Sequence, residues 1–443
     1  MVNLFEHFNM DTQTLYDTLR IAGHNDPTIV LVDDGFLPED IITPYSFFAN
    51  YQAPYRGRGR YFNEVPVPRF WEIAGNNSKA WVKDLNHQRA TIYYHSSEKR
   101  RIVSHVEWCN QHGQLQFVDH YNQHGLHFAQ TVYDLKGKKI FRRYMDQEGR
   151  EVIYENFIAS SIILTWKEKQ YHFNNTIDFF IFFLKAIEVD LNHCVINSLS
   201  TPFLILYHLD VPGQDTLFWQ ETSQGDIPGN MRVILEKRTR RPCRVLISQR
   251  KEYDAIAAQL TEVERSRVAH CGYLYTFQSQ NQHRMNILTM TNSDQIENLE
   301  KIVQACPFAT FYIGAVTEMS QRLTQFECYS NVVLYPTIKK PTIEKLYHEC
   351  DVYLDINNGT EIINAVRKAF DAGMLILGYT DIVHQRRWVA PENLFAKADG
   401  ASELIRALKD IHSEKQCFKV RQSYQQLHTN ATTVEAFNKI YVL

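Results

Sequence analysis

Two short polar clusters follow predicted strands and are the first candidates for binding chemistry. The apolar run at 28–32 ends at Asp33 and Asp34, and Phe36 follows closely. Acids at the carboxyl end of a strand in an open α/β sheet face the ligand crevice. A simple turn accounts for the same residues, and we favour that interpretation because Asp and Gly are common turn formers. The alternative keeps Asp33, Asp34 and Phe36 as ligand-binding candidates.

The second cluster is Trp219, Gln220 and Glu221, at the end of a predicted strand that begins near Leu217. An indole can stack on a sugar ring while amide and carboxylate groups hydrogen bond its hydroxyls. A buried Trp with satisfied neighbours is the simpler interpretation. Both interpretations stay open at this point.

No other spacing of residues in the sequence indicates catalysis or metal binding. His120, His124 and His127 are spaced like metal ligands, but they straddle a predicted hairpin turn and no acid or Cys joins them. The chain has no glycine-rich phosphate loop, no nucleophile elbow and no helical His-Glu-x-x-His pattern. We therefore predict no catalytic residue, no metal and no cofactor.

The stretch 353–379 predicts the element around which the rest is organised: strand, loop, helix, strand. Asn357-Asn358-Gly359 has loop chemistry, because Asn and Gly accept the positive φ of tight turns. Gly373 ends the predicted helix, and 374–377 is the second strand. The apolar helix positions are Ile362, Ile363, Val366, Ala369 and Phe370.

This unit resembles the donor-binding βα unit of retaining glycosyltransferases with two Rossmann-like lobes. In those enzymes a Glu at the strand end and a second Glu eight positions on hold the nucleotide sugar, and a Gly lies three places after the first. Gly359 matches that Gly, but Ile356 and Asn364 stand at the two carboxylate positions. A charged acceptor is worth about 1.5–3 kcal/mol per hydrogen bond, against about 1 kcal/mol for a neutral one. Glu361 is a candidate replacement, although we expect it to point elsewhere on the helix.

A second donor element is also missing. Enzymes of this kind carry an Arg and a Lys just after the first long strand of the second lobe, where they bind the diphosphate. The matching segment 287–295 holds no base. Two independent losses in one lobe indicate a transferase scaffold without donor binding.

Length, composition and charge indicate the class of protein and its location in the cell. The chain has 443 residues, 44% hydrophobic and 22% charged, with a formal net charge of −3, which argues against nucleic acid as a partner. Its eight cysteines are scattered, as expected for reduced thiols. The N-terminus has no signal-peptide pattern, and the longest apolar run, at 179–184, is too short to span a bilayer. We predict a cytoplasmic protein.

The pattern predicts an α/β fold in four segments. Residues 1–68 and 174–240 form the first Rossmann-like lobe, 69–173 form an inserted antiparallel β-sheet domain, and 241–443 form the second lobe with a C-terminal helix. The basic stretch 237–244 is interpreted as the linker between lobes. Phe203–Leu209 is assigned to the strand and loop segments of the first lobe. Predicted strands of the second lobe are 245–248, 285–291, 310–314, 332–335, 352–356 and 374–377.

Three long motifs resemble one family. They are VLVDDGFLPEDIITPYSFF at 30–48, SLSTPFLILYHLDVPGQDTLFWQE at 198–221 with DIPGNM at 226–231, and NILTMTNSDQIENLEKI at 286–302. They are similar to the stabilising subunit of a bacterial two-protein O-GlcNAc transferase. The resemblance implies two Rossmann-like lobes with an extended β-sheet domain, and a heterotetramer with a catalytic sibling. It also implies an unfolded acceptor, the serine-rich repeat adhesins exported by the accessory Sec system.

The leading hypothesis is therefore a non-catalytic, acceptor-binding partner of a GlcNAc transferase, in the cytoplasm or peripherally on the inner face of the membrane. The acceptor-binding candidates are Asp33, Asp34, Phe36, Trp219, Gln220 and Glu221. One rival is an active retaining glycosyltransferase with a rewired donor site that uses Glu361. Another is a peptide- or glycan-binding protein that acts without a sibling.

Overall fold

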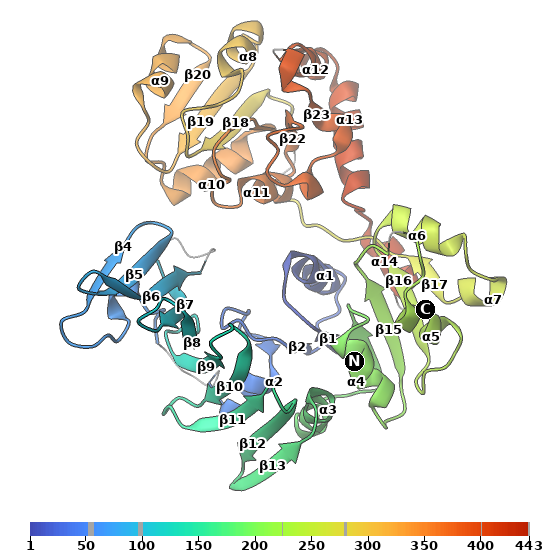
Figure 1. Ribbon diagram of the computed structural model, residues 1–443. Coiled ribbons are helices and arrows are strands. Elements are labelled where there is room, and N and C mark those ends of the chain that lie inside the picture. Colours follow the sequence, from blue (N-terminus) through green and yellow to red (C-terminus); the bar gives the residue numbers. More distant parts are fainter. Residues whose placement is uncertain (52–56, 96–100, 224, 279–280, 400, 442–443) are drawn as a thin grey trace. The chain divides into compact units, whose positions relative to one another are not determined.

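The computed structural model describes the chain apart from residues 52–56, 96–100, 224, 279–280, 400 and 442–443 (Figure 1). The described residues form two compact units. Unit 1 comprises Met1–Tyr16 and His24–Cys271, and unit 2 comprises Asp17–Gly23 and Gly272–Leu443. Each unit contains one parallel sheet, and unit 1 adds a large antiparallel sheet. The predicted fold class, two Rossmann-like lobes with an inserted antiparallel β-sheet domain, is confirmed.

The parallel sheet of unit 1 has seven strands in the order β17-β16-β15-β14-β1-β2-β3. Its inner strand β1 is fully buried, and Leu4 lies between Ile196 and Ile29 of the neighbouring strands. The strands are β1 (Val2–Phe5), β2 (Thr28–Val30), β3 (Ile41–Ile42), β14 (His193–Ile196), β15 (Gln214–Trp219), β16 (Cys243–Ile247) and β17 (Val268–His270). The helices are α1 (Met10–Ile21), α2 (Pro44–Ala49), α3 (Thr176–Ala186), α4 (Thr201–His208), α5 (Gly229–Leu235), α6 (Arg250–Ala257) and α7 (Glu262–Arg265).

Two predictions for the first lobe are wrong. The second lobe does not begin at residue 241, because β16 pairs with β15 from Asp215 opposite Cys243 to Trp219 opposite Ile247, and β17 extends the same sheet. The stretch 237–244 therefore joins α5 to β16 and is not a linker between lobes. Residues 203–208 are helical, since Pro202 occupies the first turn of α4, where a missing N–H costs nothing.

The antiparallel sheet has ten strands in chain order, so every strand pairs with its sequence neighbours. They are β4 (Glu72–Gly75), β5 (Lys79–Asp84), β6 (His87–Tyr94), β7 (Val103–Cys109), β8 (Leu115–Tyr121), β9 (His127–Tyr133), β10 (Lys139–Met145), β11 (Glu151–Asn156), β12 (Ser161–Trp166) and β13 (Lys169–Phe173). A meander of this kind places successive turns at alternate ends of the sheet.

The two faces of this sheet are covered differently. One face of β9–β12 shares a core with α2 and α3 of the lobe, and the ring of Tyr144 stacks on Tyr45 with centroids 4.0 Å apart. On the other face, the segment 62–71 covers the first strands. The remainder of that face, which carries Phe117 and Phe141, is only half-buried.

Unit 2 is built on six parallel strands in the order β20-β19-β18-β21-β22-β23. They are β18 (Asn286–Thr291), β19 (Thr310–Ala315), β20 (Val332–Tyr335), β21 (Val352–Asp355), β22 (Leu375–Tyr379) and β23 (Leu394–Phe395). The helices are α8 (Leu299–Ala305), α9 (Gln321–Thr324), α10 (Lys340–Glu349), α11 (Ala365–Asp371), α12 (Ser402–Ser413), α13 (Lys415–His428) and α14 (Val434–Tyr441). Short 3-10 turns are Phe62–Glu64 in unit 1 and Gln325–Cys328, Arg386–Trp388, Pro391–Asn393 and Lys397–Asp399 in unit 2. The five strands predicted from residue 285 onward are confirmed to within two residues at either end.

Candidate functional site

The strand order of unit 1 reverses direction between β1 and β14, and this reversal locates the ligand crevice. In open α/β sheets, ligands bind at the carboxyl ends of the strands on either side of such a switch point. Here those ends are Glu6 after β1 and Asn197 and Ser198 after β14. The backbone N–H of Glu6 donates to the side-chain oxygen of Asn197 at 3.4 Å, which ties the two strand ends together.

The carboxylate of Glu6 organises the edge of the crevice. It accepts hydrogen bonds from the hydroxyls of Ser198, Ser200 and Thr201, at 2.9, 3.1 and 3.0 Å. Ser200 and Thr201 begin α4, so the acid lies at the positive end of that helix. Glu6 thereby holds the loop after β14 in one conformation.

Beside this loop is an open hollow of about 340 Å³. Its lining combines the loop after β14 with the loop after β15, namely Ser198, Leu199, Ser200, Trp219, Glu221, Thr222, Ser223 and Pro228. Burial raises the pKa of Glu221, and the charge of Glu6 adds to that effect. The hydroxyl oxygen of Ser223 is buried without a hydrogen-bond partner among the described residues. The hollow can therefore take a ligand rich in hydrogen-bond donors.

The three residues predicted to act together after β15, Trp219, Gln220 and Glu221, have different environments. Glu221 is exposed at the hollow, whereas Trp219 is only 3% exposed and its indole N–H points to Glu252 at 3.5 Å. Gln220 is buried and donates to the backbone carbonyl of Asp11 at 2.8 Å. The indole face is thus mostly core, as the simpler interpretation held, and Gln220 braces the sheet edge.

Asp33, Asp34 and Phe36 do not line the hollow. The Asp33 carboxylate accepts from the N–H of Gly35 and from the hydroxyls of Thr43 and Tyr51, at 2.8, 2.7 and 2.5 Å. Burial raises its pKa, and these hydrogen bonds act in the opposite direction. The turn interpretation of Asp33 fits this geometry.

Asp34 and Phe36 lie in the same loop, which contacts the antiparallel sheet. Asp34 is exposed and accepts from the N–H of Phe36, whose ring stacks on His95 at 3.9 Å. A side chain at Gly35 would come within 2.9 Å of the backbone of Asn122 in the inserted sheet. This loop therefore fastens the lobe to the antiparallel sheet.

The position that matches the donor site lies in unit 2, after β21. Ile356 is fully buried in the apolar core of that unit, facing away from any ligand. Asn364 is exposed, has a left-handed backbone (φ 53°) and makes no capping hydrogen bond to α11. The helix begins at Ala365, so Ile362 and Ile363 precede it, contrary to the prediction. Neither donor position offers a carboxylate, and only the amide of Asn364 could make a weak hydrogen bond to a sugar.

At the switch point of unit 2 the loops after β18 and β21 bond to each other, and an open hollow of about 360 Å³ lies beside Asn292, Ser293 and Asp294. The loop after β18 meets the loop after β21 through the hydrogen bonds Asn292 Nδ2 to Thr360, Asn358 N to Gln295 O, Asn358 Nδ2 to Glu297 and Thr291 to Asn357. Gly359 lies so close that a Cβ there would be 2.1 Å from the Asn292 oxygen. Gly359 is therefore needed for close approach and not, as predicted, for a positive φ.

A buried ion pair between His384 and Asp355 also holds the loop after β21. The imidazole of His384 contacts Asp355 at 2.5 Å and the carbonyl oxygen of Gly359 at 2.7 Å. The hydrogen bond to Asp355 raises the pKa of His384 to about 9, and the Gly359 carbonyl adds to this. At neutral pH the charged imidazolium therefore ties β21 to the loop that follows it.

Glu361, the candidate replacement, is also occupied. One oxygen accepts from the N–H of Val366 at 3.0 Å, and the other accepts from the side chain of Gln385 at 2.5 Å. It precedes α11 instead of lying on it, and it closes the exposed N–H groups of the first turn. This position is structural.

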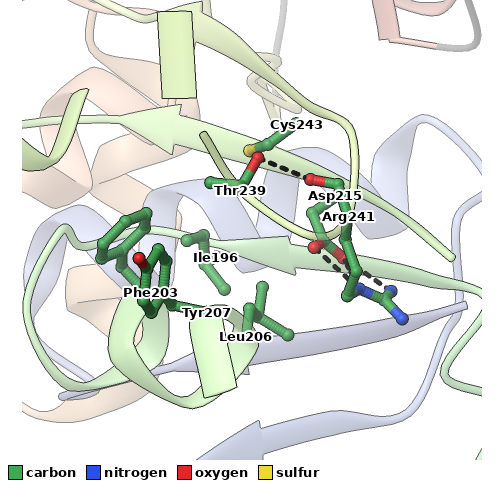
Figure 2. A pocket seen from close by; sticks show the side chains of 8 residues that line it. All are labelled: Ile196, Phe203, Leu206, Tyr207, Asp215, Thr239, Arg241 and Cys243. Carbon is green, nitrogen blue, oxygen red and sulfur yellow. Dashed lines mark hydrogen bonds and ion pairs between the residues drawn. The ribbon is translucent and has the colours of Figure 1, made fainter. Parts of the chain in front are cut away.

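A small cavity near the other end of the unit 1 sheet is not a ligand site. Figure 2 shows its lining, in which Arg241 and Asp215 face each other. Their ion pair is 2.7 Å long and both side chains are at most 3% exposed. The cavity measures only about 10 Å³, too small for a ligand. Arg241, predicted to be a solvated linker residue, is a core cross-link.

The three histidines considered as metal ligands lie apart. His120 contacts the hydroxyl of Thr131 at 2.9 Å, and burial lowers its pKa to about 3. His127 lies 3.1 Å from Asp119, and Asp119 and His120 are neighbours in β8 that point to opposite faces. The described residues contain no group of three or more His, Cys, Asp or Glu side chains that could bind a metal.

Taken together, the fold and the two strand edges define a class: a glycosyltransferase-like protein of two Rossmann-like lobes in which the donor position lacks both carboxylates. Family models cover most of the chain. They are the GtfB N-terminal domain at residues 2–48, the GtfB middle domain at 71–174, the GtfB third domain at 176–259 and the GftB/GlyA-F C-terminal domain at 287–425.

The chain belongs to the GtfB family. It is 36% identical over 440 residues to the UDP-N-acetylglucosamine--peptide N-acetylglucosaminyltransferase stabilizing protein GtfB of Streptococcus agalactiae, which covers 99% of this chain and 98% of that protein. It is 37% identical to the GtfB of Streptococcus gordonii with the same coverage. Both relatives are named as stabilising proteins of a peptide N-acetylglucosaminyltransferase.

Solved structures agree with this. A crystal structure of the GtfA/B complex bound to UDP and GlcNAc contains a chain that is 37% identical, with a TM-score of 0.91 and 99% coverage of both chains. The accessory secretory protein 1, 2 and 3 structure of Streptococcus pneumoniae shares the fold at 11% identity and a TM-score of 0.61.

Sequence reasoning missed Glu6, Ser198 and Ser200. The signal was available, since Glu6 directly follows an apolar strand and the serines follow another. The pairing of those two strands at the switch point was what the sequence pattern did not show.

Proposed function

We propose that this chain is the stabilising, acceptor-binding subunit of a protein O-GlcNAc transferase and holds a disordered serine-rich polypeptide for a catalytic sibling. The observation that carries the proposal is the donor position in unit 2, where Gly359 packs on Asn292 and Glu361 caps a helix. A loop built in this way offers no free carboxylate to a sugar nucleotide, because Ile356 is buried and Glu361 is already bonded to Val366 and Gln385. The names of the relatives, stabilising proteins of a GlcNAc-peptide transferase, support the same role.

The open hollow of unit 1 suits the acceptor. A serine-rich chain has little apolar surface, so it must be held by hydrogen bonds from its hydroxyls and backbone N–H groups. Glu221, which is exposed at the hollow, is an acceptor for such donors. The finer identity of the client, a serine-rich repeat adhesin of the accessory Sec system, is part of this proposal and follows from the family resemblance.

The catalytic sibling is the proposed partner of the antiparallel sheet. Trp108, Phe117, Val132 and Phe141 are directly opposite one another across β7–β10 and remain half-buried on the uncovered face. Aromatic residues at the centre of a partly apolar patch are typical of protein interfaces. We propose that this face contributes to a heterotetramer in the cytoplasm.

Transfer assays separate this proposal from the active-enzyme rival. The purified chain, incubated with UDP-GlcNAc and a serine-rich acceptor, should transfer no sugar, while its mixture with the sibling should. Glu361→Gln should leave the transfer rate of the mixture within about twofold, since Glu361 does not face a ligand. Transfer by the chain alone, abolished in Glu361→Gln, would establish the rival.

Acceptor binding tests the hollow. Fluorescence anisotropy with a labelled serine-rich peptide should show roughly fivefold to tenfold weaker binding for Glu221→Gln, because a charge-assisted hydrogen bond becomes a neutral one. Glu236→Gln is the matched control, since Glu236 is exposed and pairs only with Arg238. Equal affinities for the wild type and Glu221→Gln would remove the hollow from the acceptor site. Failure to isolate the chain together with its sibling would favour the third interpretation, a binding protein that acts alone.

A further inference from the structure

The exposed large apolar residues of the antiparallel sheet all lie at one end of it. Among the described residues of β4–β13 and their turns, these are Leu85, Leu135 and Ile158, which are 85%, 70% and 76% exposed. They occupy the β5–β6, β9–β10 and β11–β12 turns, and alternate turns of a meander share an end. The turns at this end of the sheet therefore expose apolar side chains.

The opposite end of the sheet is attached to the lobe of unit 1. In the β8–β9 turn, Gln123 donates to the carbonyl oxygen of Leu37 at 3.1 Å. In the β10–β11 turn, Gln147 donates to the carbonyl oxygen of Asn50 at 2.9 Å. The apolar tips thus belong to the end that is not fastened to the lobe by these turns.

Three neighbouring turns at the free end form one surface, which we call the tip patch: residues 110–114, 134–139 and 157–160. Gln114 donates to the carbonyl oxygen of Leu135 at 3.5 Å, and the ammonium of Lys139 lies 5.6 Å from the ring centre of Phe157. Turns two strands apart are about 10 Å from each other. Leu135 and Ile158 therefore protrude side by side.

The tip patch is basic. Its residues include Lys136, Lys138 and Lys139 and a single acid, Asp134. The Asp134 carboxylate is taken up by the turn itself, where it accepts from the N–H groups of Lys136 and Lys138 at 2.8 Å. All three lysines are exposed; among the described residues Lys139 interacts electrostatically with the carboxylate of Glu155, and the ammonium groups of Lys136 and Lys138 make no ion pair.

We propose that the tip patch is a contact surface for anionic lipid. Protruding apolar side chains ringed by lysines match an interface in which Leu135 and Ile158 enter the headgroup layer and the ammonium groups meet lipid phosphates. A membrane-spanning segment is not involved, because no helix among the described residues is long and apolar enough to cross a bilayer. This inference does not depend on the acceptor site in unit 1.

Co-sedimentation of the full chain with vesicles tests the proposal. Binding should be measurable on vesicles of phosphatidylglycerol and phosphatidylcholine in equal parts, weak on pure phosphatidylcholine, and reduced by salt. Replacing Lys136, Lys138 and Lys139 by Gln should weaken binding on the order of a hundredfold, from about fivefold per lysine. The double variant Leu135→Ser and Ile158→Ser should weaken it by roughly tenfold or more.

Leu85→Ser is the matched control. It removes an equally exposed leucine from a turn, Asp84–His87, that carries no lysine, and it should leave vesicle binding unchanged. All of these side chains are exposed, so circular dichroism should be the same for every variant. A fluorescent Leu135→Trp variant should shift its emission to the blue on anionic vesicles.

Two results would overturn the proposal. One is vesicle binding that neither set of substitutions changes. The other is loss of co-purification with the catalytic sibling in the tip variants while vesicle binding stays intact, which would make the tip patch a protein interface.

Discussion

Arg241 and Arg238 lie three residues apart in one basic stretch, yet they have opposite environments. Arg241 is buried and pairs with Asp215, while Arg238 is 61% exposed and pairs with Glu236. A run of basic residues in a sequence shows charge but not which member the sheet buries. That is why the stretch was interpreted as a solvated linker.

Arg241→Met should lower the free energy of unfolding by about 3–5 kcal/mol, because Asp215 is then left charged and unpaired in the core. Arg238→Ala should change it by less than about 0.5 kcal/mol, as for other exposed pairs. Urea denaturation followed by tryptophan fluorescence measures both. The double variant Arg241→Met and Asp215→Leu should recover part of the loss, and equal losses in the single and double variants would contradict this account.

His384 provides a pH-dependent test at the same scale. Its pKa in the folded protein is raised to about 9 from the ordinary 6.5, chiefly by Asp355. A raised pKa means that the charged pair stabilises the fold fully below about 6.5 and that this contribution is lost as the pH rises through about 9. The wild type should therefore be more thermostable than His384→Ala at pH 6, and the gap should narrow by pH 10.

Calorimetry at pH 6, 8 and 10 gives the melting temperatures for this comparison. His172→Ala is the control, because His172 is exposed on the edge strand β13 and should show no such dependence. A gap that is constant with pH would mean that the His384 charge does not contribute.

At the scale of elements, apolar runs flanked by turn residues located five of the six strands of the unit 2 sheet but fewer of the seven in unit 1, among them β2, β15 and β16. The errors have physical causes. A continuous apolar run such as 203–209 fits a buried strand or a buried helix equally well, and only Pro202 distinguishes them. The assignment of β16 to the first lobe depends on pairing with β15, which no local pattern encodes.

The candidate site was predictable in part for the same reason. Glu221 followed from its place at a strand end, and the loss of donor carboxylates followed from Ile356 and Asn364. The closure of the donor loops did not, because it depends on Asn292 meeting Gly359 across 67 residues of sequence.

Gly359→Ala tests that closure. The added methyl would meet the Asn292 oxygen at 2.1 Å and the Cβ of Ser293 at 2.9 Å, so the two loops must move apart. We expect a loss of about 1–3 kcal/mol in the free energy of unfolding, as for other overpacked sites. Asn292→Ala in the same chain should restore part of it, and a double variant no more stable than Gly359→Ala would show that the two residues do not meet.

At the scale of the whole molecule, both parallel sheets retain a switch point, and each has an open hollow beside it. The strand orders β14-β1 and β18-β21 are equivalent, and the difference lies in the loops. In unit 1 the loops are joined through the Glu6 carboxylate and Ser198, and in unit 2 they are joined through side-chain amides such as Asn292 to Thr360. The two lobes thus share one architecture and differ in the side chains that join their switch-point loops.

The antiparallel sheet is then left as the part most suited to hold a partner. The double variant Phe117→Ser and Phe141→Ser should weaken association with the catalytic sibling at least tenfold, since central aromatic residues of an interface each contribute more than about 1 kcal/mol. Both side chains are only half-buried in the isolated chain, so circular dichroism should not change. Phe70→Ser is the control, because Phe70 is 85% exposed and lies outside the sheet. Size-exclusion chromatography of mixtures at falling concentration gives the affinities, and a variant complex as stable as the wild type would move the interface to another surface.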